Sequence, residues 1–436
     1  MNFLVIGSGA REHIIAQKLS DSDVNVFSVL TNRNPGMMKL SKEFIFVNNY
    51  QNSLKLIIDF ALLKEIGCVV IGPEDPLALG FSDAFWKKGI PVVGPLRLLA
   101  QIETSKGFTR DLLNKNGIDV SPKYQRFESM NGVEDFISFL LGEYVVKYDG
   151  LMGGKGVKVS GEHLMTVQDG IKYCNELIGS GGSFVIEEKL LGEEFSMMSF
   201  CDGENVAHMP AVQDHKRAYE GDIGPNTGGM GCYTDFNHSL PFVKDNELND
   251  ARVINERVAR ALRDEFGEGY KGILYGGFMI TKEGVKLIEY NARFGDPEAM
   301  NLLTLLESDF ASICMNIAEG NLGGVDFRKE ASVCKYIVPK GYGSNPVKDA
   351  TLAVNDSYKE HADLYYAAVN LDDTGIIETT SSRSAAVVSN GKDIAEAESK
   401  CEKAITYISG NNLYVRNDIA KSHLIEKRIA NMESIR

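Results

Sequence analysis

The sequence predicts a multidomain protein with a Rossmann-like α/β domain first and α+β structure in the rest. Its 436 residues exceed the size of one ordinary hydrophobic core, so two to four domains are expected. Residues 1 to about 102 alternate short apolar runs with helical patterns, which predicts a parallel sheet with helices on both faces. Beyond about residue 120 strands and helices follow no regular alternation, which is typical of α+β domains.

Four apolar runs are expected to form the strands of the first domain. They are FLVIG (3–7), VNVFSVL (24–30), CVVIG (68–72) and IPVVG (90–94). Helical periodicity appears between them in REHIIAQKL (11–19) and SLKLIIDFALLKEI (53–66). A further helix is expected at about 104–116, because Asn116-Gly117 would end it, and Ser121-Pro122 then marks a break.

The remaining chain divides into three stretches. From about 120 to 190 we expect a small α+β unit in which strands flank a glycine-rich loop. Residues 190–325 continue with more strands, a loop-rich stretch and two long helices, the first at 251–266. The last part, about 326–436, combines the strand-like runs SVCKYIV and AAVVS with a helix at 394–406.

The composition excludes several classes of protein. The net charge of −14 argues against a nucleic-acid-binding protein, which needs a basic surface. No run approaches about 18 uninterrupted apolar residues, and the N-terminus lacks the basic segment of a signal peptide, so no membrane segment is expected. Seven scattered cysteines without a CxxC pair indicate reduced thiols in a cytoplasmic protein.

The first glycine-rich motif, GSGAREH (7–13), follows a predicted strand and opens a helix. Such a turn lets the backbone approach an anion, and the helix N-terminus offers free N–H groups. A nicotinamide cofactor is not expected, because Glu12 replaces the third glycine of the dinucleotide fingerprint and Thr31-Asn32 replaces its acidic residue. The motif indicates a site for a phosphate-bearing small molecule or, alternatively, a tight turn without a ligand. GPEDPL (72–77) lies at the same carboxyl edge of the predicted sheet.

The second motif, VVKYDGLMGGKGVKVS (145–160), places four glycines around Lys155 between two predicted strands. Lys147 lies on the incoming strand. A Walker loop would need GxxxxGK[ST] leading into a helix, so this is a different kind of phosphate site. A glycine-rich hairpin that carries lysine can fold over a triphosphate and exclude water. The alternative, a plain flexible hairpin, has no evident need for a lysine among its glycines.

Two polar stretches follow this predicted lid. VIEEKLLGEEFS (185–196) carries acidic pairs, which are usually solvated surface. Beside a phosphate lid, the backbone of such a linker can receive adenine and a glutamate can hold ribose hydroxyls. QDHKR (213–217) and GPNTGGMG (224–231) lack periodicity, which suits a substrate loop. His215 is interpreted as structural or exposed, because a lone histidine is more often so than catalytic.

The strand LIEYNARFGDPE (287–298) is the most informative segment. Strict alternation would place Ile288, Tyr290, Ala292 and Phe294 on an apolar face, and Glu289, Asn291 and Arg293 on the other face with Leu287. A carboxylate, an amide oxygen and a guanidinium in a row suit a hard metal ion and the anion that it accompanies. The alternative is an edge strand with a solvated polar face. The two further carboxylates of Gly295-Asp296-Pro297-Glu298 favour the metal site.

Taken in this order, the motifs resemble the ATP-grasp superfamily and, within it, the phosphoribosylamine–glycine ligase family. The resemblance spans residues 7 to 298. It is carried by GSGAREH, GPEDPL, KYDGLMGGKGV, IEEKLLGEEFS, QDHKR, GPNTGGMG and IEYNARFGDPE.

The resemblance implies a preATP-grasp domain at 1–102, an ATP-grasp domain at 103–325 with a mobile lid at about 120–190, and a C-terminal domain at 326–436. It implies a cytoplasmic carbon–nitrogen ligase of de novo purine (IMP) biosynthesis that uses ATP with Mg²⁺, or with Mn²⁺ in its place. The reaction would join glycine to 5-phosphoribosylamine through a glycyl phosphate, giving glycinamide ribonucleotide, ADP and phosphate. Neither nucleic acid nor a membrane is an expected partner, and a monomer or dimer is expected.

The resemblance also implies roles for individual residues. Nucleotide contacts are expected from Lys106, Lys147, Lys155, Glu187, Glu188 and Glu194. Magnesium ligands are expected from Glu289 and Asn291. Substrate contacts are expected from Gly9, Glu74, Asp214, Asn226, Thr227, Gly228 and Arg293, and the catalytic residues would be Arg293, Lys155 and Asp214.

Two departures from the family pattern matter. Tyr148 stands in the lid where many relatives have a small residue, and Gly277 stands where some relatives carry a metal ligand, which leaves a second magnesium without an assigned ligand. Two other functions stay open at this point. One is an ATP-grasp enzyme with another carboxylate substrate, and the other is a nucleotide-binding regulatory protein without turnover.

Overall fold

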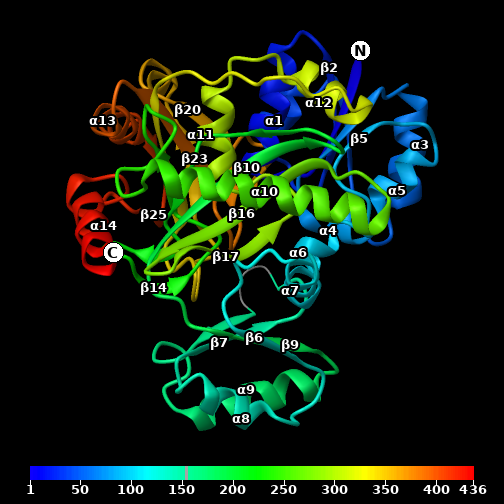
Figure 1. Cartoon of the computed structure of the whole chain (residues 1–436). Helices are drawn as coiled ribbons and strands as arrows, with labels where there is room; N and C mark the ends of the chain where they lie inside the picture. Colours follow the sequence, from blue (N-terminus) through cyan, green and yellow to red (C-terminus); the bar gives the residue numbers. More distant parts are fainter. Residues whose placement is uncertain (153–155) are drawn as a thin grey trace.

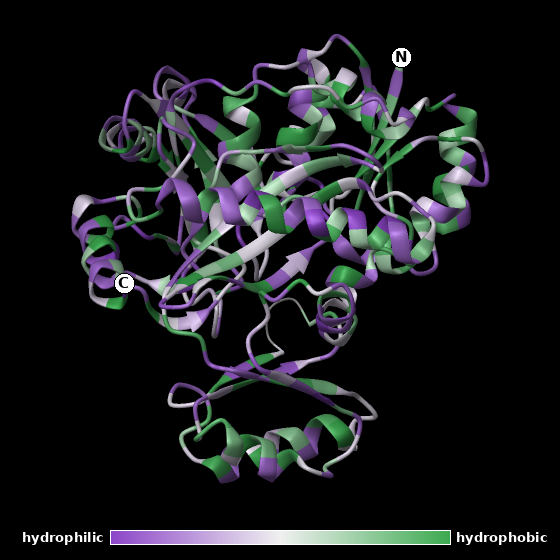
Figure 2. Cartoon of the chain, in the orientation of Figure 1, coloured by the Kyte–Doolittle hydropathy of each residue, from purple (hydrophilic) through white to green (hydrophobic). Residues whose placement is uncertain are grey.

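The computed structural model describes residues 1–152 and 156–436. Figure 1 shows a large body from which a small domain, made of the segment from β6 to β9, projects. Figure 2 shows that the strands inside the body are largely apolar, whereas the helices around them carry polar and apolar stripes. Within the described part of the chain, no helix has the length and apolarity needed to cross a membrane.

The N-terminal part contains the expected parallel sheet, in the strand order β3-β2-β1-β4-β5. Its strands are β1 (Asn2–Ile6), β2 (Asn25–Leu30), β3 (Glu43–Phe46), β4 (Cys68–Ile71) and β5 (Val92–Val93). Its helices are α1 (Ala10–Asp21), α2 (Pro35–Leu40), α3 (Leu54–Leu63), α4 (Glu74–Ala78) and α5 (Phe81–Trp86). The edge strand β3 was not predicted, because none of its four residues is buried and so they form no buried apolar run.

The projecting domain is built on an antiparallel sheet in the order β6-β9-β7-β8. Its elements are β6 (Tyr124–Phe127), α8 (Val133–Phe139), β7 (Tyr144–Tyr148), β8 (Val157–Val159), α9 (Val167–Gly179) and β9 (Phe184–Glu188). Phe127, Val146, Phe184 and Ile186 belong to an apolar core that is separate from the main core. A domain with its own core can move as a unit, which suits the predicted lid.

The middle of the body is a second antiparallel sheet, in the order β11-β10-β16-β17. Its strands are β10 (Glu193–Asp202), β11 (Val206–His208), β16 (Lys271–Thr281) and β17 (Gly284–Asn291). The accompanying helices are α6 (Gln101–Thr104), α7 (Lys106–Lys115), α10 (Asp245–Phe266), α11 (Glu298–Leu305) and α12 (Phe310–Glu319). Helix α10 begins six residues before the predicted start, because its first turn is polar and carries no apolar periodicity.

The last sheet joins the middle of the chain to its end. Its strand order is β12-β15-β18-β23-β20, with β25 paired to β18. Its strands are β12 (Gln213–Asp214), β15 (Gly231–Thr234), β18 (Ala331–Pro339), β20 (Asp363–Tyr366), β23 (Ala385–Gly391) and β25 (Leu413–Val415). Because β15 pairs with β18, this sheet runs across the expected boundary at residue 326.

Smaller elements complete the C-terminal part. They are the hairpin β13 (Arg217–Tyr219) and β14 (Ile223–Asn226), the strands β19 (Thr351–Val354), β21 (Val369–Leu371), β22 (Ile377–Thr379) and β24 (Ile408–Ser409), the 3₁₀ helix η1 (Asp356–Glu360), and the helices α13 (Ile394–Ile405) and α14 (Ser422–Ile435). Helix α13 was predicted and α14 was not. Only Leu424 and Met432 of α14 are buried, too few to give an apolar stripe.

Candidate active site

Strand β17 forms one wall of the site, and its side chains differ from the prediction at one point. Leu287 is fully buried and Ile288 is partly exposed, the reverse of what was expected. The cause is a β-bulge: Gly277 pairs with Glu289 but the next residue, Phe278, pairs with Leu287, which leaves Ile288 as the extra residue. From Glu289 onward the alternation is as predicted.

The carbonyl oxygen of the bulged residue Ile288 is a hydrogen-bond acceptor for two basic side chains. This oxygen accepts hydrogen bonds from the Arg110 guanidinium at 2.9 Å and from Lys147 Nζ at 3.0 Å. Arg110, on α7, also holds Glu187 of β9 through two hydrogen bonds of 2.8 and 3.0 Å. The bulge thus connects the lid strands to the central sheet.

Glu289 lies at the centre of the basic part of the site. Burial raises the pKa of Glu289, but the net shift is downward because four cationic side chains surround it: Lys216, Lys106, Lys147 and Arg293. Glu289 is therefore ionised at neutral pH. A carboxylate beside several cations suits a metal bound together with a polyphosphate.

The residues of β17 fit a partial magnesium site. Asn291 Oδ1 lies beside Glu289 on the same face and accepts a 3.2 Å hydrogen bond from Arg293. Among residues 1–152 and 156–436 no group of three or more His, Cys, Asp and Glu side chains is arranged to hold a metal. Magnesium usually takes only one or two protein carboxylates and completes its shell with phosphates and water, so Glu289 with Asn291 suits it.

Arg293 connects β17 to the N-terminal domain. Its guanidinium lies 3.3 Å from Glu74 and 2.8 Å from Glu103, whose other oxygen accepts a 2.8 Å hydrogen bond from the Ala292 amide. Burial raises the pKa of Glu74, yet Arg293 and Arg11 hold it at about 2. Glu103, on α6, was not predicted. Two residues expected to contact different substrates, Arg293 and Glu74, are therefore in direct contact.

The turn around Gly9 differs from an open anion site. The Gly9 amide donates a 2.6 Å hydrogen bond to the carboxylate of Glu12. A Cβ on Gly7 would lie 2.4 Å from Glu12, and one on Gly72 would lie 2.1 Å from it. These glycines make room for the chain's own carboxylate, which supports the alternative of a structural turn. Gly9 still faces the site, because its Cβ position is 3.9 Å from Asp296.

Residues expected to contact the nucleotide already have polar partners within the protein. Lys147 Nζ lies 2.6 Å from Glu187, and Lys106 Nζ donates to the carbonyl of Gly150 at 3.0 Å. Burial raises the pKa of Glu187, but Arg110 and Lys147 lower it to about 2. Glu188 is more exposed and lies 3.8 Å from Lys123. Lys155 falls outside the described residues.

Asp214 lies away from the lid, and its environment contrasts with that of Glu187 because its pKa is raised and not lowered. Burial and the carboxylate of Glu298 raise its pKa well above the ordinary value. Within the described part of the chain its Oδ1 atom is buried without a hydrogen-bond partner. Glu298 is buried and accepts a 2.9 Å hydrogen bond from Tyr275. This pair of carboxylates is suited to receive a cationic group.

The loop 226–229 lies against Asp214. Thr227 donates two hydrogen bonds of 2.8 Å to the Lys216 carbonyl, one from its amide and one from its hydroxyl. Gly229 has φ +103°, and a Cβ there would lie 2.7 Å from Asp214, so the position requires glycine. Gly228 donates to the Tyr342 hydroxyl at 3.3 Å. Asn226 is exposed and pairs with Arg217 in the β13–β14 hairpin.

Two further basic residues complete the site. Lys216 Nζ lies 3.1 Å from Glu194, the residue expected to contact the ribose. Arg383 of the C-terminal part lies 3.1 Å from Asp296 and donates to the Asp296 carbonyl at 2.8 Å. Arg383 was not predicted, because its segment carries none of the recognised motifs.

A lid that faces an antiparallel sheet, with a carboxylate among lysines between them, defines a protein of the ATP-grasp class. Family models for phosphoribosylglycinamide synthetase match the whole arrangement: the N domain at residues 1–103, the ATP-grasp (A) domain at 104–299 and the C domain at 332–422. The chain belongs to the phosphoribosylglycinamide synthetase family.

Individual relatives agree with this assignment. A phosphoribosylamine–glycine ligase of Methanosarcina barkeri is 44% identical over 440 residues, which cover 100% of both chains. The crystal structure of phosphoribosylamine–glycine ligase from Thermotoga maritima is similar with a TM-score of 0.80 at 25% identity, covering 96% of this chain and 100% of that one.

The same fold occurs in a more distant enzyme. The biotin carboxylase domain of 2-oxoglutarate carboxylase from Hydrogenobacter thermophilus, solved in complex with MgADP and bicarbonate, has a TM-score of 0.71 at 14% identity. The match covers 99% of this chain and 93% of that one. At this identity the likeness concerns the fold alone.

Proposed function

We propose that this protein joins glycine to 5-phosphoribosylamine with ATP, giving glycinamide ribonucleotide, ADP and phosphate in purine biosynthesis. One observation carries the proposal. Asp214, whose buried Oδ1 has no hydrogen-bond partner in the described chain, lies with Glu298 near the basic cluster around Glu289, and Arg293 of that cluster is in contact with Glu74. Sites for a cationic amine, a polyphosphate and a third reactant thus adjoin. The full-length family relationship supports this choice.

The nucleotide is assigned to the face between the lid and β17. Lys106, Lys147 and Lys155 would contact phosphates, the chain at Glu187 and Glu188 would border adenine, and Glu194 would hold the ribose. Glu289 and Asn291 would hold Mg²⁺, or Mn²⁺ in its place. Bound there, the metal would neutralise phosphate charge and orient the γ-phosphate.

Glycine is assigned to the position beside Asp214. Its ammonium would lie between Asp214 and Glu298, and its carboxylate would point to Arg293, with the loop containing Asn226, Thr227 and Gly228 over it. A carboxylate oxygen of glycine would form a bond to the γ-phosphorus as ADP leaves, giving glycyl phosphate. The amine of phosphoribosylamine, held near Gly9 and Glu74, would then attack the carbonyl carbon, and phosphate and a proton would leave.

The protein's contribution to these steps is positioning and charge neutralisation. No side-chain nucleophile is required, because both bonds form between bound reactants. Lys155 and Arg293 would stabilise the charge that spreads over the transferred phosphoryl group. The lid would keep water from the acyl phosphate. We also propose a cytoplasmic location and a monomeric or dimeric state.

The decisive experiment measures ADP release with glycine and freshly prepared phosphoribosylamine, each alone and both together. We expect sustained release only when both are present with ATP and Mg²⁺. Release that ignores glycine would refute the ligase and favour another ATP-grasp enzyme with a different carboxylate substrate. Nucleotide binding without release under any combination would favour a regulatory protein.

A further inference from the structure

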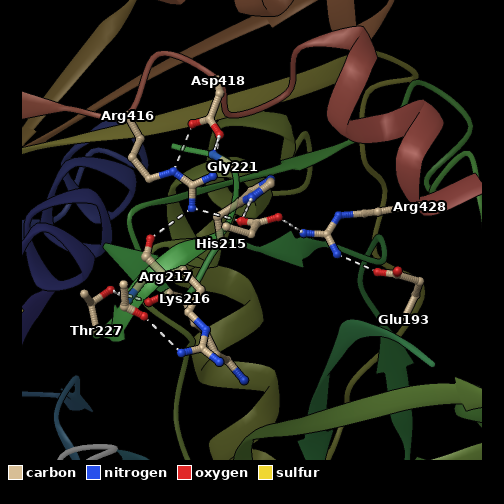
Figure 3. Close-up of polar contacts among 12 residues, drawn as sticks. Glu193, His215, Lys216, Arg217, Gly221, Thr227, Arg416, Asp418 and Arg428 are labelled. Carbon is tan, nitrogen blue, oxygen red and sulfur yellow. Dashed lines mark hydrogen bonds and ion pairs between the residues drawn. The ribbon is translucent and has the colours of Figure 1, made fainter. Parts of the chain in front are cut away.

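Behind the glycine and ribose positions lies a partly buried ionic network that the proposed chemistry does not use (Figure 3). Its central residue is Arg428 of α14. One branch of its guanidinium lies 2.5 Å from Glu193 at the start of β10, and the other lies 2.8 Å from Asp222 in the turn between β13 and β14. Asn431, one turn later on α14, donates to the second oxygen of Glu193 at 2.6 Å.

Glu193 is linked to the ribose position because it is followed directly in β10 by Glu194, the residue assigned to the ribose. Successive residues of a strand point to opposite faces, so Glu193 points to α14 and Glu194 points into the site. There Glu194 pairs with Lys216 at 3.1 Å. The start of β10 is therefore held on both faces: Arg428 binds Glu193 on the face toward α14, and Lys216 binds Glu194 on the face toward the site.

Asp222 is linked to the glycine position through His215, which contacts Asp222 and is adjacent to Asp214 in the chain. The imidazole of His215 is buried, with Nδ1 3.1 Å from Asp222 Oδ1. Burial lowers the pKa of His215 to about 4, so the neutral ring donates its Nδ1–H to the Asp222 carboxylate. His215 lies between Asp214 and Lys216 in the chain. Fixing its ring therefore fixes the backbone from which both functional side chains project.

A second arginine holds the same turn in place. Arg416, fully buried, donates to Asp222 at 2.9 Å and binds Asp418 with two hydrogen bonds of 2.9 and 2.7 Å. Asp418 also accepts a 2.7 Å hydrogen bond from the Gly221 amide. Figure 3 shows Arg416 and Arg428 on the two sides of His215. The turn is thus held by two arginines, of which only Arg428 extends to β10.

We propose that Arg428 is a positioning residue that sets the spacing between the ribose contact Glu194 and the glycine contact Asp214. The inference rests on the proposed function, because it takes these two positions from it. Helix α14 begins at the last residue matched by the C domain model, so its role lies in a part of the chain that the family model does not describe.

The test compares Arg428→Gln with Arg436→Gln. Arg436 is the matched control because it joins the end of the same helix to Glu247 at 2.6 Å, far along the chain from the site residues. We expect Arg428→Gln to raise the KM for ATP and for glycine by about tenfold each, the change that corresponds to losing one modest contact. The KM for phosphoribosylamine should not change, and Arg436→Gln should leave all three KM values unchanged.

Other outcomes are informative in both directions. Equal kinetics in the two variants, or a loss of kcat with unchanged KM values, would overturn the positioning role, because either result describes a merely structural contact. If Arg428→Gln does not fold, Arg428→Lys retains the charge but lacks the planar guanidinium that spans Glu193 and Asp222, and we expect the same KM pattern at smaller size. Wild-type KM values in that variant would overturn the proposal.

A binding measurement separates this inference from the proposed function. Titration with a fluorescent ADP analogue and Mg²⁺ needs no ligation. A wild-type protein that binds the analogue but does not ligate glycine would refute the proposed function alone. Wild-type affinity for the analogue in Arg428→Gln would refute the positioning role whatever the reaction is.

Discussion

Two buried carboxylate clusters on opposite sides of the site are built in opposite ways. Glu187, on the lid side, is in contact with two cations, Arg110 and Lys147, and its pKa is about 2. Asp214, on the other side, faces the carboxylate of Glu298, has a raised pKa, and keeps one buried oxygen without a partner in the described chain. The first cluster is complete as it stands. Within the described residues the second contains no ion pair to Asp214, although Lys216 and Arg383 act on its charge from a longer distance, and a ligand with an amino group would supply the direct partner.

The largest expected effect is on stability, in the complete cluster. Glu187→Gln leaves Arg110 and Lys147 buried without a carboxylate, and we expect the free energy of unfolding to fall by about 3–5 kcal/mol. Urea unfolding, with the midpoint and slope both measured, tests this. An unchanged midpoint would show that the cluster does not hold the lid to the body.

The next effect is on activity, in the incomplete cluster. Asp214→Asn removes a carboxylate that forms no ion pair within the described residues and whose charge is opposed by burial and by Glu298, so we expect no loss of stability. We expect kcat/KM for glycine to fall about 100-fold, equivalent to about 2.7 kcal/mol of transition-state binding. Steady-state kinetics with varied glycine measures it. If Asp214→Asn were less stable than the wild type but had normal kinetics, the Asp214 cluster would serve stability and not substrate binding, which would contradict its assignment.

The pH dependence of stability should differ in sign between the clusters. The pKa of Glu187 falls from its ordinary 4.5 to about 2, so its stabilisation is present above about pH 4.5 and is lost as the pH falls toward 2. The pKa of Asp214 is raised above 3.8, so its ionisation opposes folding as the pH rises through the raised value. In chemical unfolding from pH 3 to 8, the free energy of unfolding of Asp214→Asn should increase relative to that of the wild type as the pH rises. A constant difference would contradict the raised pKa.

The smallest effect is expected beside the complete cluster. Glu188 is adjacent to Glu187, but its carboxylate is partly exposed and lies 3.8 Å from Lys123. Surface pairs of this kind contribute little, so Glu188→Gln should change the free energy of unfolding by less than about 1 kcal/mol. The same urea experiment serves as the control for Glu187→Gln. A loss as large as that of Glu187→Gln would mean that the effect belongs to the strand and not to the ion pair.

Much of the fold could be predicted because it depends on local patterns. The buried runs of β1, β2 and β4 and the strands around the glycine loop were recognisable in the sequence, and all are present. Strand β3 and helix α14 were not, because each buries too few residues to form a pattern. The order of Leu287 and Ile288 was predicted wrongly, since the bulge depends on pairing with β16, which the local sequence does not encode.

The site divides in the same way. Glu289, Asn291 and Arg293 could be proposed from the sequence because they alternate along one strand and follow a recognisable lid motif. Glu103 and Arg383 were missed as functional residues, because only the tertiary fold brings them to that strand and its neighbours. Glu298 was expected to support the metal site, whereas in the structure its carboxylate acts on Asp214. Asp214 was predicted from its motif, but its proximity to the carboxylate of Glu298 is visible only in the structure.

The central claim is that the Asp214 cluster recognises the amino group of glycine. The most direct test is calorimetric titration of the wild type and Asp214→Asn with glycine and with acetate, which lacks the amine, in the presence of MgADP. We expect the wild type to bind glycine more tightly than acetate and Asp214→Asn to lose most of that preference. An equal preference for glycine in both proteins would contradict the claim.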